Sequence, residues 1–180
     1  MANTMPSLPK TIPIGKDHTM TFLDDPYWVM RVHIQGNDDI ADIPPHWHDT
    51  HDEVFRVIKG QIQYTINGVA KTYSPDDGEI LIPRRVVHSV KSFEGVEVIF
   101  EKGIRPMDNT KELFFRNLFA QGKLETRLLP MAQIGSHFDM YPSLPGNLRW
   151  LEKGLFIVLG KIAGTIGYSL AYKDASTRDA

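Results

Sequence analysis

The sequence predicts a mainly β protein, an antiparallel sandwich or barrel, that carries a helical extension at its C-terminal side. Between about residues 27 and 104, short runs of β-branched and aromatic residues alternate with turn-forming residues. After Gly103 the composition changes, and apolar residues recur three or four positions apart, as they do on one face of a helix. The 180 residues suffice for one domain with a real core. We therefore expect an N-terminal arm (1–26), a β domain (27–104) and a C-terminal helical extension (105–180).

The first part of the chain is expected to be extended. Residues 1–20 are rich in Pro, Thr and Lys, which favours an arm that runs over the barrel or toward a second subunit. Residues 36–45 have the composition of a loop. Between them, residues 27–35 predict a strand in which four apolar side chains share one face: Trp28, Met30, Val32 and Ile34.

The later strands are short and are separated by turns. Asn67-Gly68 tolerates the positive φ angles of a type I′ turn, so we expect it to join strands at 61–66 and 69–73 in a hairpin. Three further strands are expected at 79–82, 86–91 and 96–100.

The extension is expected to contain helices. Asn109 can cap a helix over residues 110–121, which Gly122 would end. A second short helix is expected over 123–132, interrupted by Pro130, and a loop over 136–146. A long helix should follow, because apolar residues recur at helical spacing: Leu148, Leu151, Leu155, Leu159, Ile162, Ile166 and Leu170. Four glycines within that helix weaken it, which predicts close packing against another element: Gly154, Gly160, Gly164 and Gly167.

The stretch from His46 to Gly60 carries the strongest chemical signal. Residues two apart share a face of a strand, so His46 and His48 point the same way. Glu53 stands five residues after His48, and an unbroken strand would send it to the opposite face. Turn-forming residues at 49–52 let Glu53 return to the histidines. Two imidazoles and one carboxylate would then converge, which is a metal site that lacks one ligand.

A second stretch runs from Gly78 through Pro83 to His88 and offers a candidate for the missing ligand. Together the two stretches resemble the two motifs of the cupin family. The first, HxHx4Ex6G, matches at His46, His48, Glu53 and Gly60. The second, Gx5PxGx2H, matches at Pro83 and His88, with Gly78 one residue late and Arg85 in place of the inner glycine. The resemblance covers about residues 27–103.

This resemblance implies a single small antiparallel β-barrel of the jelly-roll type. It also implies a metal held by four residues: His46, His48, Glu53 and His88. A single cupin barrel with a helical tail looks like the small fungal cupins of secondary-metabolite pathways.

Three imidazoles and one carboxylate suit divalent Fe, Mn, Ni, Cu or Zn. Four protein ligands on a six-coordinate ion leave two positions open, which permits oxygenation and equally permits Lewis-acid chemistry. We expect a metal-dependent, dioxygenase-like enzyme that acts on a small, largely apolar metabolite of the aromatic or polyketide type. The alternatives are a non-redox isomerase, cyclase, dehydratase or decarboxylase, and a non-catalytic cupin that binds a small molecule.

Residues outside the ligand set are candidates for catalysis and substrate binding. His33 and His51 are the candidate catalytic groups, although a strand histidine is more often a bonded wall residue and a turn histidine more often faces solvent. Arg85, three residues before His88, would need a positive φ and could clamp a carboxylate or enolate; the alternative is a solvent-facing cation. Three residues of the first helix would form an apolar substrate wall: Phe114, Phe115 and Phe119.

Composition limits partners and location. Lys plus Arg is 20 against 22 for Asp plus Glu, and a net charge of −2 gives nucleic acid no reason to bind. The absence of cysteine excludes disulfides and thiolate ligands. The first residues lack a basic region followed by an apolar core, so we expect no secretory signal. We therefore expect a cytoplasmic location. Residues 148–171 are barely long enough to span a membrane, and packing on the barrel or across a homodimer is favoured over peripheral membrane contact.

Overall fold

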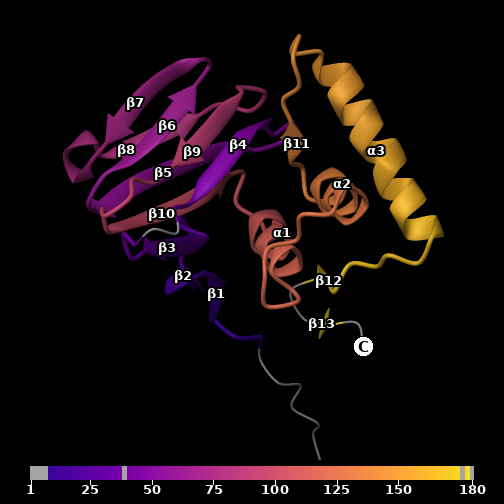
Figure 1. Ribbon diagram of the computed structural model, residues 1–180, viewed down its shortest axis with the longest axis horizontal. Coiled ribbons are helices and arrows are strands. Elements are labelled where there is room, and N and C mark those ends of the chain that lie inside the picture. The colour runs from indigo at the N-terminus through magenta and orange to yellow at the C-terminus, as the bar shows by residue number, and fades with distance from the viewer. Residues whose placement is uncertain (1–7, 38–39, 175–176, 179–180) are drawn as a thin grey trace, which may run out of the picture.

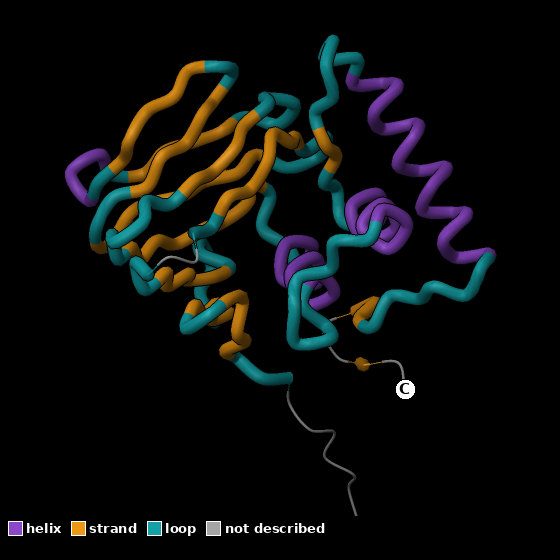
Figure 2. The backbone as a smooth tube through the Cα atoms, in the orientation of Figure 1, coloured by secondary structure: helices purple, strands orange, loops and turns teal. Residues whose placement is uncertain are grey.

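The computed structural model describes residues 8–37, 40–174 and 177–178. Two antiparallel sheets form one side of the molecule, and the helices of the described residues lie at the other side (Figure 1). The tube in Figure 2 shows most strands on one side and the longer helices on the other, with one short helical turn on the strand side. The predicted fold class is confirmed: the protein is mainly β, with a jelly-roll-like pair of sheets and a helical extension.

The larger sheet has six strands in the order β1-β2-β3-β10-β5-β8. Their bounds are β1 Thr11–Gly15, β2 His18–Phe22, β3 Met30–Ile34, β10 Val98–Arg105, β5 Asp52–Lys59 and β8 Glu79–Ile82. The smaller sheet has five strands in the order β11-β4-β9-β6-β7. Their bounds are β11 Tyr141–Pro142, β4 Asp42–Trp47, β9 His88–Lys91, β6 Ile62–Ile66 and β7 Val69–Tyr73. A 3-10 turn, η1 Pro75–Asp77, precedes β8, and β12 Tyr172–Asp174 pairs with β13 Thr177–Arg178.

The alternation of apolar residues predicted the inner strands well. In and just before β3, the four alternating residues are all buried: Trp28, Met30, Val32 and Ile34. The hairpin of β6 and β7 is also confirmed, because Asn67 has φ 49° and Gly68 has φ 81°. Of the residues predicted as an arm, 11–15 and 18–22 form β1 and β2, which extend the larger sheet beside β3, and 1–7 lie outside the described residues. Residues 42–45, predicted as loop, belong to β4.

The core lies between the two sheets. Phe55 of β5 stacks on Tyr64 of β6, with ring centroids 3.7 Å apart, so the sheets meet through an aromatic pair. Gly60 follows β5 with φ 76°, and a Cβ built there would lie 1.9 Å from the backbone oxygen of Glu97. Only glycine fits this close approach, which explains why the histidine-rich stretch ends on one.

The helical extension contains α1 Thr110–Leu118, α2 Leu128–His137 and α3 Arg149–Thr165. Asn109 takes the predicted N-cap position of α1, but its side chain makes no capping hydrogen bond, and Oδ1 of Asp108 accepts the Thr110 N–H instead, at 2.8 Å. Pro130 lies in the first turn of α2, where its missing N–H is not needed, so it does not interrupt the helix.

Helix α3 packs on α2 through a small residue. A Cβ on Gly160 would lie 2.6 Å from Oγ of Ser136, so this glycine marks the predicted close contact. A Cβ on Gly154 would meet open space, so Gly154 does not mark a close contact.

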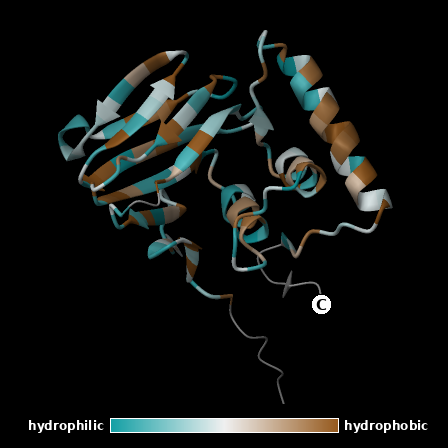
Figure 3. Cartoon of the chain, viewed as in Figure 1, coloured by the Kyte–Doolittle hydropathy of each residue, from teal (hydrophilic) through white to brown (hydrophobic). Residues whose placement is uncertain are grey.

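Most of the apolar repeat of α3 faces outward, although Leu159 packs against the cluster that contains Trp47 and Tyr141. Leu151, Leu155 and Ile162 are exposed, and Figure 3 shows hydrophobic residues along this helix. The buried residues of α3 are Glu152, Phe156, Gly160 and Ala163. The inward face of α3 thus carries one phenylalanine, two small residues and one anchored carboxylate. None of the helices in the described residues is long and apolar enough to cross a membrane. The homodimer contact expected here stays a prediction.

Candidate metal centre

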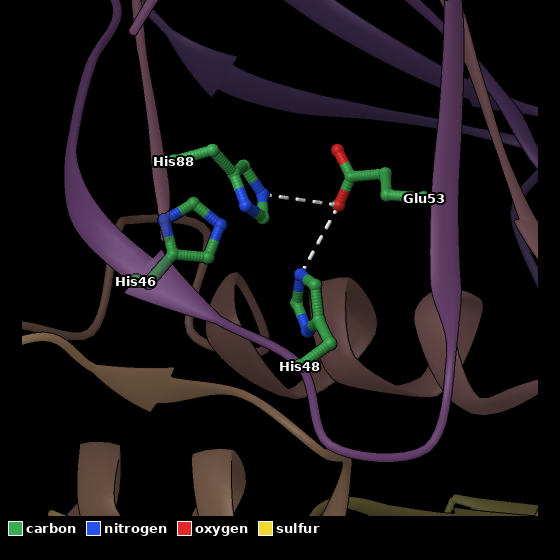
Figure 4. A group of neighbouring side chains, drawn as sticks. All are labelled: His46, His48, Glu53 and His88. Atoms are coloured by element: carbon green, nitrogen blue, oxygen red, sulfur yellow. Dashed lines mark hydrogen bonds and ion pairs between the residues drawn. The ribbon is translucent and has the colours of Figure 1, made fainter. Parts of the chain in front are cut away.

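Four side chains converge between the two sheets: His46, His48, Glu53 and His88 (Figure 4). One nitrogen or carboxylate oxygen from each lies within 4.8 Å of the others. All four residues are buried, at 5% exposure or less. The convergence predicted from the sequence is confirmed.

The chain reaches this arrangement by changing sheets. His46 of β4 pairs in register with His88 of β9, so these two histidines are neighbours in the smaller sheet. Residues 48–51 then carry the chain from the end of β4 to the start of β5, in the larger sheet. Glu53 therefore faces the histidines from the opposite sheet, which is how the predicted turn brings it back to them.

A backbone carbonyl orients each of the three imidazoles. The Nδ1 atoms lie within hydrogen-bond distance of carbonyl oxygens: His46 with Pro44 at 2.8 Å, His48 with Asp139 at 2.6 Å, and His88 with Val86 at 3.1 Å. Because a carbonyl oxygen only accepts, each Nδ1 carries the proton and each Nε2 presents a lone pair. This is the tautomer that a metal-binding histidine needs, with its second nitrogen held by the protein.

The Nε2 atoms of His88 and His48 have unusual surroundings. Nε2 of His88 is buried and has no hydrogen-bond partner among the described residues. Nε2 of His48 lies 3.1 Å from Oε2 of Glu53, although both atoms are acceptors in this tautomer. Two facing acceptors need a cation beside them, and here Nζ of Lys111 lies 3.2 Å from Nε2 of His48 and 3.0 Å from Oε2 of Glu53. An orphaned nitrogen and two such acceptors fit a bound metal ion.

The environment also keeps the imidazoles of His46 and His48 neutral. Burial lowers the pKa of His46 well below its ordinary value, and His88 and His48 lower it further. Burial and then the Lys111 ammonium lower the pKa of His48 to about 4. Neutral imidazole is the form that binds a metal, because a protonated ring has no lone pair to offer.

A family model described as "Cupin domain" matches residues 31–100, a stretch that contains all four converging residues. The chain therefore contains a cupin domain over this stretch.

Curated fungal proteins are similar to this cupin over 74% of its length. "Probable oxidoreductase yanE" of Aspergillus niger is 30% identical over 154 residues, which cover 59% of that protein. "Probable oxidoreductase patJ" of Penicillium expansum is 39% identical over 149 residues, which cover 46% of that protein. "Epoxidase atD" of Aspergillus terreus is 26% identical and is covered over 47% of its length. This cupin thus spans about half the length of the curated relatives it matches.

Solved structures are similar at lower identity. KdgF from Halomonas sp. shares 17% identity, with a TM-score of 0.45, over 56% of this chain and 91% of that chain.

Two buried lysines contact Glu53, and neither was predicted for the site. Nζ of Lys102, on β10, pairs with Oε1 of Glu53. Nζ of Lys111, in the first turn of α1, lies 3.0 Å from Oε2 of Glu53 and 3.2 Å from Nε2 of His48. Burial by itself raises the pKa of Glu53, but the two ammonium groups hold it well below its usual range. A sequence signal existed for Lys102, because it takes the inward-facing register of Phe100 and Ile104.

His51 does not belong to the converging set in this cupin. Its Nε2 lies 2.9 Å from Oδ2 of Asp108, and its Nδ1 lies 2.9 Å from Oδ2 of Asp139. The Asp139 carboxylate also accepts the backbone N–H groups of Asp49 and Thr50, at 2.9 and 2.8 Å. This network fixes the crossing segment 48–51, from which His48 enters the cluster. A catalytic role of His51 stays a prediction.

Asp139→Ala is expected to lower the free energy of unfolding by about 1.5–3 kcal/mol, the range for a lost hydrogen bond to a charged group. The physical reason is that several backbone N–H groups of segment 48–51 lose their charged acceptor at once. Chemical denaturation measures the change, and Asp76→Ala, at an exposed position in η1, is the matched control. Equal stability of Asp139→Ala and wild type would mean that the crossing segment is held by other contacts.

His33 also lies outside the converging set. It alternates with the buried Val32 and Ile34, so it points to the other face of the sheet, where its Nε2 is 2.8 Å from Oε1 of Glu97. The structure brings neither predicted catalytic histidine to the four donor atoms.

The predicted substrate residues are placed as follows. Arg85 has φ 66°, as expected for a residue in place of the turn glycine. Its Nε donates to Oδ1 of Asp49 at 2.6 Å, and its side chain is 64% exposed, so the guanidinium is held at the surface. Phe114 and Phe115 are buried in the main core, and Phe119 packs against it. Their contacts with a substrate stay predictions.

A further contact ties the cluster to α3. Nε1 of Trp47, the residue between His46 and His48, donates to Oε2 of Glu152 at 2.7 Å. The other oxygen of Glu152 accepts the Leu144 N–H at 2.7 Å. Sequence reasoning missed this pair because a glutamate on a helix is usually exposed.

Proposed function

We propose that this cupin is a metal-dependent enzyme that oxygenates a small, largely apolar metabolite of the aromatic or polyketide type. The observation that carries the proposal is the buried meeting of three Nε2 lone pairs and one carboxylate within 4.8 Å. The names of the fungal relatives, two oxidoreductases and an epoxidase, support a redox reaction.

The side chains and backbone of this protein bind the metal ion and orient its ligands. His46, His48, Glu53 and His88 would hold the ion, and divalent Fe, Mn, Ni, Cu and Zn all suit this set. When bound, such an ion supplies Lewis acidity and, if it is redox-active, a reaction with dioxygen. The backbone carbonyls fix the three rings, and burial excludes bulk water from the donor atoms.

Turnover is expected to require dioxygen. The test incubates the Fe(II)-loaded protein with a panel of small aromatic and polyketide acids, in air and under strict anaerobiosis. Product formation and dioxygen uptake, followed with an electrode, should both disappear without dioxygen. His88→Ala, which lacks one of the ligands, provides the matched background rate.

Two results would redirect the assignment. Undiminished anaerobic conversion would indicate a metal-assisted isomerase, cyclase, dehydratase or decarboxylase. Binding of a panel compound without conversion in either atmosphere would indicate a cupin that only binds its ligand.

A further inference from the structure

Three charged side chains meet at the centre with one positive charge in excess. The Glu53 carboxylate is fully buried and carries one negative charge, while Lys102 and Lys111 each bring an ammonium group to it. The two lysine side chains are only 4% and 8% exposed, so water screens their charges poorly. A divalent ion bound by the same carboxylate would add two more positive charges.

Carboxylates in the surroundings do not balance this excess. Glu53 is the one carboxylate within ion-pair distance of Lys102 or Lys111 in the described part of the chain. Asp139 binds the crossing segment and His51, and Asp108 binds His51. Asp139 acts on Lys111 electrostatically without pairing with it, so the ion pairs of the described residues leave a metal-loaded centre with an excess of positive charge.

Lys111 is the cation that stands closest to the ligand atoms. Its Nζ contacts Oε2 of Glu53 and Nε2 of His48, the two facing acceptors of the cluster. A metal ion that binds these two atoms takes over both contacts of the ammonium. Because a lysine side chain is flexible, the displaced ammonium can turn to another acceptor beside the ion.

We propose that the metal-loaded centre binds an anion and that Lys111 is the side chain that holds it. The anion is the carboxylate, phenolate or enolate oxygen of the substrate, which takes an open position on the ion while Lys102 remains on Glu53. This inference rests on the proposed metal centre and adds the charge of the substrate to it. In this inference Lys111 of α1 binds the acidic group of the substrate. Arg85 does not, because its guanidinium is paired with Asp49 at the surface.

The test uses Co(II) as the metal and azide as a small anionic probe. Wild type, Lys111→Met and Lys111→Gln are loaded with Co(II), and bound metal is measured by elemental analysis. Azide is then titrated while the visible absorption bands of Co(II) are recorded. Both variants should retain Co(II) and bind azide about tenfold more weakly or worse, because a charge-assisted hydrogen bond is lost. Lys91→Met removes an exposed lysine of β9 and should bind azide like wild type.

The outcomes separate this inference from the proposed function. A wild-type protein that holds no Co(II) contradicts the metal centre itself. Co(II)-loaded variants that bind azide as tightly as wild type contradict the role of Lys111 and leave the metal centre standing. The glutamine variant preserves a polar side chain of similar length, so a folding defect of the methionine variant does not decide the test.

Discussion

His88→Ala and His48→Ala are each expected to lose more than about a hundredfold in metal affinity while the two sheets stay folded. Removing only an outer partner of a metal ligand costs roughly 10–100-fold, so removing a ligand should cost more. Each substitution deletes one of the four donor atoms that lie within 4.8 Å of one another. Elemental analysis after dialysis against a chelator gives the metal content, and circular dichroism reports the fold.

His137→Ala is the matched control for these variants, because His137 is an exposed histidine at the end of α2. It should retain the metal content of wild type. Equal metal content in wild type and in both ligand variants would show that the four residues do not bind the ion.

Glu53→Gln is expected to lower the free energy of unfolding of the metal-free protein by about 3–5 kcal/mol. The substitution keeps the shape of the side chain but leaves the buried ammonium groups of Lys102 and Lys111 without a counter-charge. Breaking one side of a buried ion pair is costly because the remaining charge cannot return to water. Chemical denaturation of chelator-treated protein measures the effect.

Two companion variants sharpen this experiment. Glu79→Gln, at an exposed position of β8, should change the stability little. Adding Lys111→Met to Glu53→Gln removes one unpaired charge and should recover part of the loss. If Glu53→Gln alone is as stable as wild type, the two lysines do not depend on this carboxylate for their burial.

The ligand cluster could be predicted because it depends on short-range order in the chain. The spacing of His46 and His48 sets their common direction, and the turn before Glu53 returns the carboxylate to them. Lys102 and Lys111 come from other elements, β10 and α1, and reach Glu53 only in the folded chain. Lysine is ordinarily exposed, so its burial was not expected from the sequence.

The prediction of the fold was likewise limited to features that depend on short-range order in the chain. Apolar alternation located β3. It missed β1 and β2, because half of their residues are either exposed or are polar residues that are only partly buried. The leucine repeat of α3 correctly predicted a helix but not its orientation. The hydrogen bond from Trp47 to Glu152, and the space that Gly160 leaves for α2, turn the polar and small residues inward instead. Such pairings join residues far apart in the chain, which periodicity does not reveal.

The position of Trp47 also gives this cupin an intrinsic optical signal. Trp47 stands between His46 and His48 in the chain, and its buried indole packs on Tyr141, with ring centroids 4.9 Å apart, and donates to Glu152. Of the three tryptophans in the chain, Trp28 lies on another strand segment and Trp150 is 75% exposed. Trp47 is therefore the tryptophan whose neighbours in the chain are ligand positions, and we expect a paramagnetic ion bound there to shorten its excited-state lifetime. The fold thus contains its own spectroscopic reporter of occupancy, without an added dye or label.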